Sequence, residues 1–157
     1  RNTPYVKHKL AMESLLANAP GKWLVFRLPL VIGRGHRGAT FAQFLYRKIS
    51  EGKSFEIWAN ATRYPLDIDD VLRVAQEFIE NRQIVNQRIN VALRSYPVSE
   101  FVRVMERIVG KKANYVQVER GAHQEIVCPE VIPLAEKFHL DYTDGYLERV
   151  LRKYFAA

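Results

Sequence analysis

Apolar runs and helical patterns alternate along this chain. Residues 3–21 (TPYVKHKLAMESLLANAPG) predict a helix, because Thr3 suits its N-cap and Pro4 its first turn, and NAPG ends it. Apolar residues spread over more than one face of this helix, which predicts that it lies between a sheet and a further element. Residues 22–33 (KWLVFRLPLVIG) form a nearly continuous apolar run, typical of a strand that is covered on both faces in a parallel sheet. Pro29 predicts that this strand bends or ends there.

The same alternation continues to the end of the chain. Thr40 begins a second helical pattern at 41–52, and Asp69 is the expected cap of a third at 70–81. A fourth helix, at 98–110, is expected to stop at Gly110. Strands or extended segments are predicted at 54–59, 62–68, 87–93 and 114–119. Two further helices are predicted at 129–138 and 144–155. Strands that alternate with helices, without repeats or long linkers, predict an α/β protein.

Composition narrows the class of protein without indicating a function. The chain of 157 residues has the size of one domain, and it has no apolar run long enough for a membrane span. The net charge of +7 is spread over several predicted helices, so nucleic acid is not the expected partner. The single cysteine, Cys128, favours a reducing compartment, and we expect a cytoplasmic protein.

The first candidate site lies in residues 5–10 (YVKHKL). Tyr5 and Lys9 are four residues apart, so they share one face of a helix. This spacing suits a phenol that exchanges a proton beside a cation that favours its ionised form. The same spacing is also typical of a half-buried aromatic residue beside a surface lysine, so the pair alone leaves both interpretations open.

Several motifs, in this order, resemble the C-terminal half of an extended short-chain dehydrogenase/reductase, the family of NAD-dependent sugar-nucleotide epimerases and dehydratases. Residues 5–9 look like the Tyr-x-x-x-Lys of that family, and 26–35 (FRLPLVIGRG) look like its next strand and glycine turn. Residues 62–71 (TRYPLDIDDV) are similar to its phosphate-binding segment, and 88–111 and 144–155 resemble its later elements. The resemblance implies part of a Rossmann-like parallel sheet, made of the C-terminal strands and helices, plus the small substrate-binding α/β subdomain.

The resemblance implies roles near the cofactor for four residues. Tyr5 would be the acid/base that moves a proton while hydride passes to or from the nicotinamide, and Lys9 would hold the nicotinamide ribose. Leu28 and Pro29 match the strand end that packs against the nicotinamide, although plain core packing explains them equally well. The implied cofactor is NAD or NADP.

Three further residues match the substrate side. Arg63 matches the arginine of the family that lies near the nucleotide phosphates, and the alternative is a surface arginine paired with Asp67 or Asp69. Arg34, with His36 beside it, could contact a further anion, and Leu30 stands where many relatives have a substrate-facing Asn. We expect no metal site, because acids at a strand-to-helix junction are more often a cap and a solvated turn.

Some positions depart from the family pattern. Leu30 replaces the usual Asn, Ile32 the usual Tyr and Arg34 the usual Pro, while Asp67 stands where the epimerases often have His. These changes bring the standard UDP-sugar or dTDP-sugar substrate into question. No G-x-x-G-x-x-G motif follows a predicted strand, so we expect residues 1–157 to be a single piece that lacks the N-terminal dinucleotide-binding half.

Three functional interpretations follow from the resemblance. The first is the substrate-side half of an NAD(P)-dependent epimerase, dehydratase or reductase acting on a nucleotide sugar or a similar hydroxyl or carbonyl compound. Such a half is expected to be inactive and to bind the dinucleotide weakly by itself. The second is a non-catalytic module of the same fold that senses a dinucleotide or binds RNA, and the third is an inactive truncated fragment. Apolar surface on the first helix and strand also predicts a homo-oligomer.

Overall fold

The computed structural model describes residues 3–35, 40–80, 85–123, 125–140, 143 and 145–156. Helices and strands alternate along the chain, as the sequence predicted. In chain order they are α1 (Pro4–Asn18), β1 (Leu24–Arg27), β2 (Leu30–Ile32), α2 (Phe41–Ser50), β3 (Phe55–Trp58), β4 (Thr62–Arg63), β5 (Pro65–Asp67), α3 (Ile68–Glu80), β6 (Gln87–Asn90), β7 (Tyr96–Pro97), α4 (Val98–Val109), β8 (Tyr115–Val118), α5 (Ile132–Lys137) and α6 (Tyr146–Phe155).

The first apolar run forms two strands, and Leu28 and Pro29 separate them. β1 ends at Arg27 and β2 begins at Leu30. Proline has no backbone N–H to give to a sheet ladder, so a break at this position was predicted and is confirmed. β1 then pairs in parallel with β6, and β2 pairs in parallel with β5.

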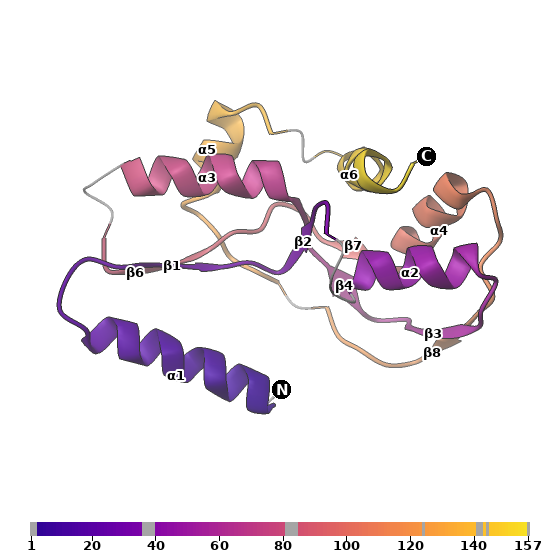
Figure 1. Ribbon diagram of the computed structural model, residues 1–157, viewed down its shortest axis with the longest axis horizontal. Coiled ribbons are helices and arrows are strands. Elements are labelled where there is room, and N and C mark those ends of the chain that lie inside the picture. The colour runs from indigo at the N-terminus through magenta and orange to yellow at the C-terminus, as the bar shows by residue number, and fades with distance from the viewer. Residues whose placement is uncertain are drawn as a thin grey trace.

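The strands form four small sheets of two strands each. Besides β1–β6 and β2–β5, β3 pairs in parallel with β8, and β4 pairs antiparallel with β7. Figure 1 shows β1 and β6 side by side at one end of the molecule and β3 and β8 at the other end. The described part of the chain is therefore an α/β structure with short, mostly parallel sheets.

Two hydrophobic cores hold these sheets and helices together. Phe101 of α4, Leu45 of α2 and Leu147 of α6 are fully buried in the first core. Ile89 of β6 is fully buried in the second core, together with Phe78 of α3. The ring of Phe78 lies 5.9 Å from the ring of Phe26, so α3 covers one face of β1. Figure 1 shows α3 and α5 on that side of the β1–β6 pair and α1 on the opposite side.

The helix α1 is not covered on both faces, so this prediction is wrong. None of its 15 residues is buried, and Leu10 and Leu15 expose 51% and 65% of their surface. In the described part of the chain, the polar contacts that join it to the strands run from Glu13 to Arg27 of β1 and Arg88 of β6. No helix in the described parts of the chain is long and apolar enough to cross a membrane.

The C-terminal helix α6 is tied to the junction between β5 and α3 by a buried carboxylate. Asp67 accepts hydrogen bonds from Lys153 Nζ and from the Tyr154 hydroxyl, both at 2.6 Å. It also accepts the backbone N–H of Asp69 at 3.0 Å. α3 begins at Ile68, so Asp67 caps this helix. The prediction that Asp69 is the cap is therefore wrong. The cap lies two residues earlier than predicted, because the carboxylate of Asp67 accepts the free backbone N–H of Asp69 in the first turn.

Asp70 belongs to the same network, but its pKa is shifted in the opposite direction from that of Asp67. Its carboxylate accepts a hydrogen bond from the Tyr146 hydroxyl at 2.9 Å. The oxygen of the Tyr146 hydroxyl in turn accepts the backbone N–H of Asp67 at 3.0 Å. Burial alone would raise the pKa of Asp67, but the hydrogen bonds from Lys153 and Tyr154 outweigh it and lower this pKa. Burial raises the pKa of Asp70 more than the hydrogen bond from Tyr146 lowers it.

Replacing Asp67 by Asn is expected to lower the free energy of unfolding at pH 7 by about 1.5–3 kcal/mol, because Lys153 and Tyr154 lose a charged acceptor. The loss stays below that of a fully buried ion pair, since the Lys153 side chain is 40% exposed. The folded-state pKa of Asp67 is lowered, so its contribution is present above the unfolded-state pKa of about 3.9 and disappears as the pH falls below it.

Urea unfolding at pH 7 and at pH 3 measures this effect, and Asp70→Asn is the matched control. The raised pKa of Asp70 means that its charge opposes folding at pH 7, so removal of this charge in Asp70→Asn should not lower the free energy of unfolding. Equal losses in the two variants at pH 7 would contradict this interpretation of the network.

Candidate active site

Tyr5 and Lys9 lie on successive turns of α1, on one face of the helix. The side-chain oxygen of Thr3 accepts the backbone N–H of Val6 at 3.3 Å, which fixes the start of the helix just before Tyr5. Lys9 Nζ lies 5.5 Å from the centroid of the Tyr5 ring. Tyr5 is 69% exposed, so its phenol is open to a ligand.

A cavity of about 440 Å³ separates this face of α1 from β1. Tyr5 and Lys9 line it from the helix, and Leu28 lines it from the end of the strand. The other lining residues are Met12, Glu13, Leu16, Val25, Phe26 and Arg27. Three residues that the sequence analysis selected are therefore brought together around one cavity.

Glu13 is the acid of this cavity, and the sequence analysis did not select it. Its carboxylate accepts two hydrogen bonds from Arg27, from Nε at 2.9 Å and from Nη2 at 2.6 Å. Arg88 of β6 adds a third contact at 3.0 Å. The hydrogen bond from Arg27 is the main reason that the pKa of Glu13 is lowered, against a smaller opposing effect of burial.

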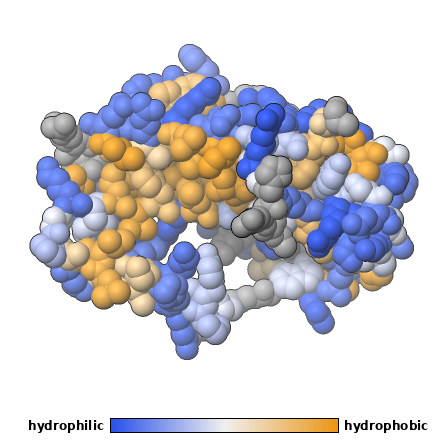
Figure 2. Space-filling view, in the orientation of Figure 1, coloured by the Kyte–Doolittle hydropathy of each residue, from blue (hydrophilic) through white to orange (hydrophobic). Residues whose placement is uncertain are grey.

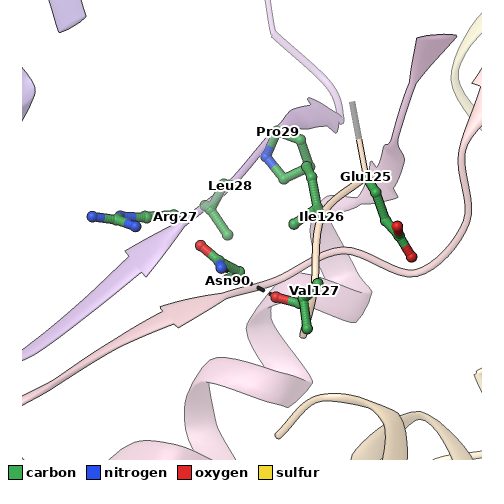
Figure 3. Close-up of a pocket in the computed structure, with 7 residues that line it drawn as sticks. All are labelled: Arg27, Leu28, Pro29, Asn90, Glu125, Ile126 and Val127. Carbon is green, nitrogen blue, oxygen red and sulfur yellow. Dashed lines mark hydrogen bonds between the residues drawn. The ribbon is translucent and has the colours of Figure 1, made fainter. Parts of the chain in front are cut away.

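A second cavity, of about 340 Å³, lies beyond the ends of β1 and β6. Leu28 lines both cavities, and Pro29 lines this one. Figure 3 shows the Leu28 side chain beside that of Asn90, with Arg27 and Glu125 at opposite ends of the group. Asn90 Nδ2 donates a hydrogen bond to the carbonyl oxygen of Val127 at 3.1 Å, which holds the segment 125–127 across this end of the strands. The carboxyl ends of parallel strands are the usual ligand-binding edge of an α/β sheet.

Arg63 lies away from Tyr5 and Lys9, in a third cavity of about 120 Å³. Its guanidinium stacks 5.7 Å from the ring centroid of Phe41, and Nη1 donates to the carbonyl oxygen of Thr62 at 2.9 Å. The alternative in which Arg63 pairs with Asp67 or Asp69 is wrong, because both carboxylates bind Lys153 instead. Within the described parts of the chain, no carboxylate forms an ion pair with Arg63.

The remaining selected residues lie around the strand β2. Leu30 is half-buried and packs against the first core. The strand ends close to α3, since a Cβ atom on Gly33 would lie 2.8 Å from Cγ2 of Ile68, and only glycine fits there without displacement. Arg34 is exposed just after β2, and His36 lies outside the described residues. In the described ranges, no group of three or more His, Cys, Asp and Glu side chains is arranged to hold a metal ion.

One signal in the sequence points to a residue that we missed. Glu13 follows Tyr5 and Lys9 at the same spacing of four, which places all three on one helix face. Arg27 and Asn90 lay inside the predicted strands, and the structure shows them as the last residues of β1 and β6 and as partners in the parallel register. For Glu125, Ile126 and Val127 we find no comparable signal, because their position depends on contacts with residues far away in the chain.

Comparisons with known proteins give a match in structure and none in sequence. No protein-family model and no curated protein sequence matches the chain. UDP-glucuronic acid 4-epimerase from Bacillus cereus, solved in complex with NAD, matches with a TM-score of 0.76 and 21% identity, over 98% of this chain and 51% of the epimerase. MoeE5 in complex with UDP-glucuronic acid and NAD matches with a TM-score of 0.72 and 21% identity, over 98% of this chain and 54% of MoeE5.

A third solved structure agrees with these two. RMD from Pseudomonas aeruginosa, complexed with NADPH, matches with a TM-score of 0.69 and 23% identity, over 96% of this chain and 54% of RMD. The chain therefore spans about half the length of the proteins that it matches. Identities of this size establish the fold. The structure thus matches that of the NAD-dependent epimerases and dehydratases, the extended short-chain dehydrogenases/reductases, over about half of their chains, in agreement with the resemblance in the sequence.

Proposed function

We propose that this chain is the substrate-side, C-terminal half of an NAD(P)-dependent epimerase, dehydratase or reductase. The substrate would be a nucleotide sugar or a similar compound in which a hydroxyl and a carbonyl interconvert. The observation that carries the proposal is the cavity that Tyr5, Lys9 and Leu28 share beside the carboxyl end of β1. In this view, residues 1–157 comprise the last strands of a Rossmann-like sheet together with the small substrate-binding α/β subdomain.

The proposed chemistry assigns one task to each residue of the cavity. The dinucleotide, when bound, supplies or accepts the hydride. Tyr5 donates a proton to the substrate oxygen, or accepts one from it, as that carbon is reduced or oxidised. Lys9, one turn further along the helix, binds the ribose hydroxyls and places a positive charge beside the phenol. Leu28 and Pro29 give the nicotinamide ring an apolar surface.

Arg63 is proposed to bind the phosphates of the substrate. It has no carboxylate partner in the described parts of the chain, and its guanidinium lies 5.7 Å from the ring centroid of Phe41. A guanidinium held in this way keeps most of its N–H donors for phosphate oxygens. Arg34, which is exposed after β2, is a second candidate for binding the substrate phosphates. Leu30 is the proposed apolar contact near the sugar.

The alternative is a module of this fold that binds a ligand without turnover. It is favoured by Leu30, Ile32 and Arg34, which stand where the related enzymes usually have Asn, Tyr and Pro. Under either function we propose a cytoplasmic protein that forms homo-oligomers, because the exposed apolar residues of α1 are suited to a protein contact.

The intact mass of the protein as its own cells produce it is the first measurement. NADH is then titrated by calorimetry into that protein and, separately, into this chain. We expect the cellular protein to be longer and to bind NADH, while this chain alone binds it weakly or not at all. If this chain is the whole protein and binds no dinucleotide, the enzyme proposal fails and the binding module becomes the better account.

A lysine variant tests the cofactor side of the proposal in the same titration. Replacing Lys9 by Met is expected to weaken NADH binding about tenfold, or about 1.4 kcal/mol, through the loss of one charged donor. Lys7→Met is the matched control, because Lys7 lies on the same helix but does not line the cavity, and it should bind as the wild type does. Unchanged affinity of Lys9→Met would contradict the assigned role.

A further inference from the structure

The helix that carries Tyr5 and Lys9 is held to the β1–β6 sheet mainly by the ion pairs of one residue, Glu13. α1 has 15 residues, and Glu13 is the only one that is not exposed. The large apolar residues of the helix all remain exposed, and Leu10 and Leu15 are more than half exposed. Hydrophobic burial, which fixes most helices in a protein, therefore contributes little to the position of this one. Figure 2 shows the open space that separates much of α1 from the rest of the molecule.

Glu13 is held in a geometry that fixes direction as well as distance. Arg27 binds both oxygens of its carboxylate, at 2.9 and 2.6 Å, and Arg88 binds one of them at 3.0 Å. A bidentate pair of this kind allows only one relative orientation of the two planes. In the β1–β6 register, Arg88 is the partner of Val25, and Arg27 lies two residues further along β1. The two arginines thus project from the same face of the strands, the face toward α1.

This ion pair joins the proposed catalytic face of α1 to the strand end below it. Glu13 follows Tyr5 and Lys9 at intervals of four residues, so the three side chains form one line along the helix. Arg27 directly precedes Leu28, which lines the same cavity. We propose that Glu13 is a positioning residue, whose bonds to Arg27 and Arg88 fix the place of Tyr5 and Lys9 relative to Leu28. The catalytic role of Tyr5 and Lys9 rests on the proposed function. The contacts of Glu13 with Arg27 and Arg88 are observed and do not depend on it.

Amide hydrogen exchange of the whole chain, followed by mass spectrometry, tests this proposal. A helix of 15 residues is marginal in water once it leaves the sheet, so its exchange rate reports its docking. Glu13→Gln, which keeps the shape and helix propensity of Glu, is expected to speed exchange within α1 tenfold or more. Glu13→Asp keeps a carboxylate and should recover most of the protection. Exchange in α4 should stay unchanged in both variants.

Glu148→Gln is the matched control, because Glu148 also binds two arginines, Arg107 and Arg152, at a place remote from α1. It should leave exchange in α1 unchanged. The environment of Tyr5 itself is followed with 3-fluorotyrosine, whose signal at this position is identified by its loss in Tyr5→Phe. Glu13→Gln should shift this ¹⁹F signal, Glu13→Asp should largely restore it, and Glu148→Gln should leave it in place.

These readouts separate the two proposals. Exchange in α1 of Glu13→Gln within about twofold of wild type, or an unmoved Tyr5 signal, would overturn the positioning role whether or not NADH binds. If both readouts respond but the cellular protein neither binds nor oxidises NADH, the proposed function fails and the attachment of α1 through Glu13 stands.

Discussion

Under the proposed function, replacing Tyr5 by Phe is expected to slow hydride transfer between NADH and the substrate by about 10²–10⁴-fold, the usual contribution of a positioned general acid or base. The variant loses only the hydroxyl, so the ring remains above Lys9. NADH affinity should therefore stay within about threefold of wild type. Because only the proton-transfer step is affected, the loss should fall on kcat and on kcat/KM to a similar extent.

The measurement is the oxidation of NADH at 340 nm by the protein as its cells produce it, with a carbonyl substrate. Tyr115→Phe serves as the control, because Tyr115 lies on β8, away from the cavity, and is also solvent-accessible. It should retain wild-type rates. A Tyr5→Phe variant that keeps more than about half of the activity would exclude this phenol as the acid or base, while loss of NADH binding in it would indicate a structural role for the hydroxyl.

The elements whose signals are local in the sequence were predicted well. Pro29 divides the first apolar run into β1 and β2, and Thr40 caps α2 with its side-chain oxygen 3.3 Å from the backbone nitrogen of Gln43. Gly110 ends α4 in the left-handed conformation that glycine adopts without strain. In each case, a residue within a few positions decides the local conformation.

The features that depend on distant residues were predicted poorly. Asp67 binds Lys153, which lies 86 positions further along the chain. No sequence pattern near either residue predicts this contact. Apolar residues on several faces of α1 predicted a helix between a sheet and a further element, whereas none of its residues is buried. Tyr5 and Lys9 were selected through their spacing, whereas Glu13 was overlooked because a lone acid on a helix is usually solvated.

Two departures from the family pattern, at positions 30 and 67, have a structural explanation. Leu30 packs toward the first core, so an apolar residue fits where the related enzymes usually have a polar one. The carboxylate of Asp67 is fully occupied by Lys153, Tyr154 and the N–H of Asp69, so it has little capacity left to bind a ligand. The attachment of α6 therefore accounts for the aspartate at position 67.

Replacing Phe101 by Ala is expected to lower the free energy of unfolding by about 3–5 kcal/mol, as is typical when a fully buried ring is removed and its site cannot collapse. Phe101 is 0% exposed at the centre of the first core. Its ring meets those of Phe41 and Tyr96 edge to face, with centroids 5.6 and 6.4 Å away. Such a loss is a large part of the 5–15 kcal/mol that stabilises a typical domain.

The same substitution should also weaken the proposed phosphate site, because Phe41 is the ring on which Arg63 stacks. Urea unfolding measures the loss of stability, and an unchanged dependence on urea concentration would show that the folded state remains compact. Leu72→Ala on α3 is the control. Leu72 is 59% exposed and should cost no more than about 0.5 kcal/mol. A loss below about 1 kcal/mol in Phe101→Ala would mean that the core around α2 and α4 repacks freely, and Phe41 could then not hold Arg63 in a fixed orientation.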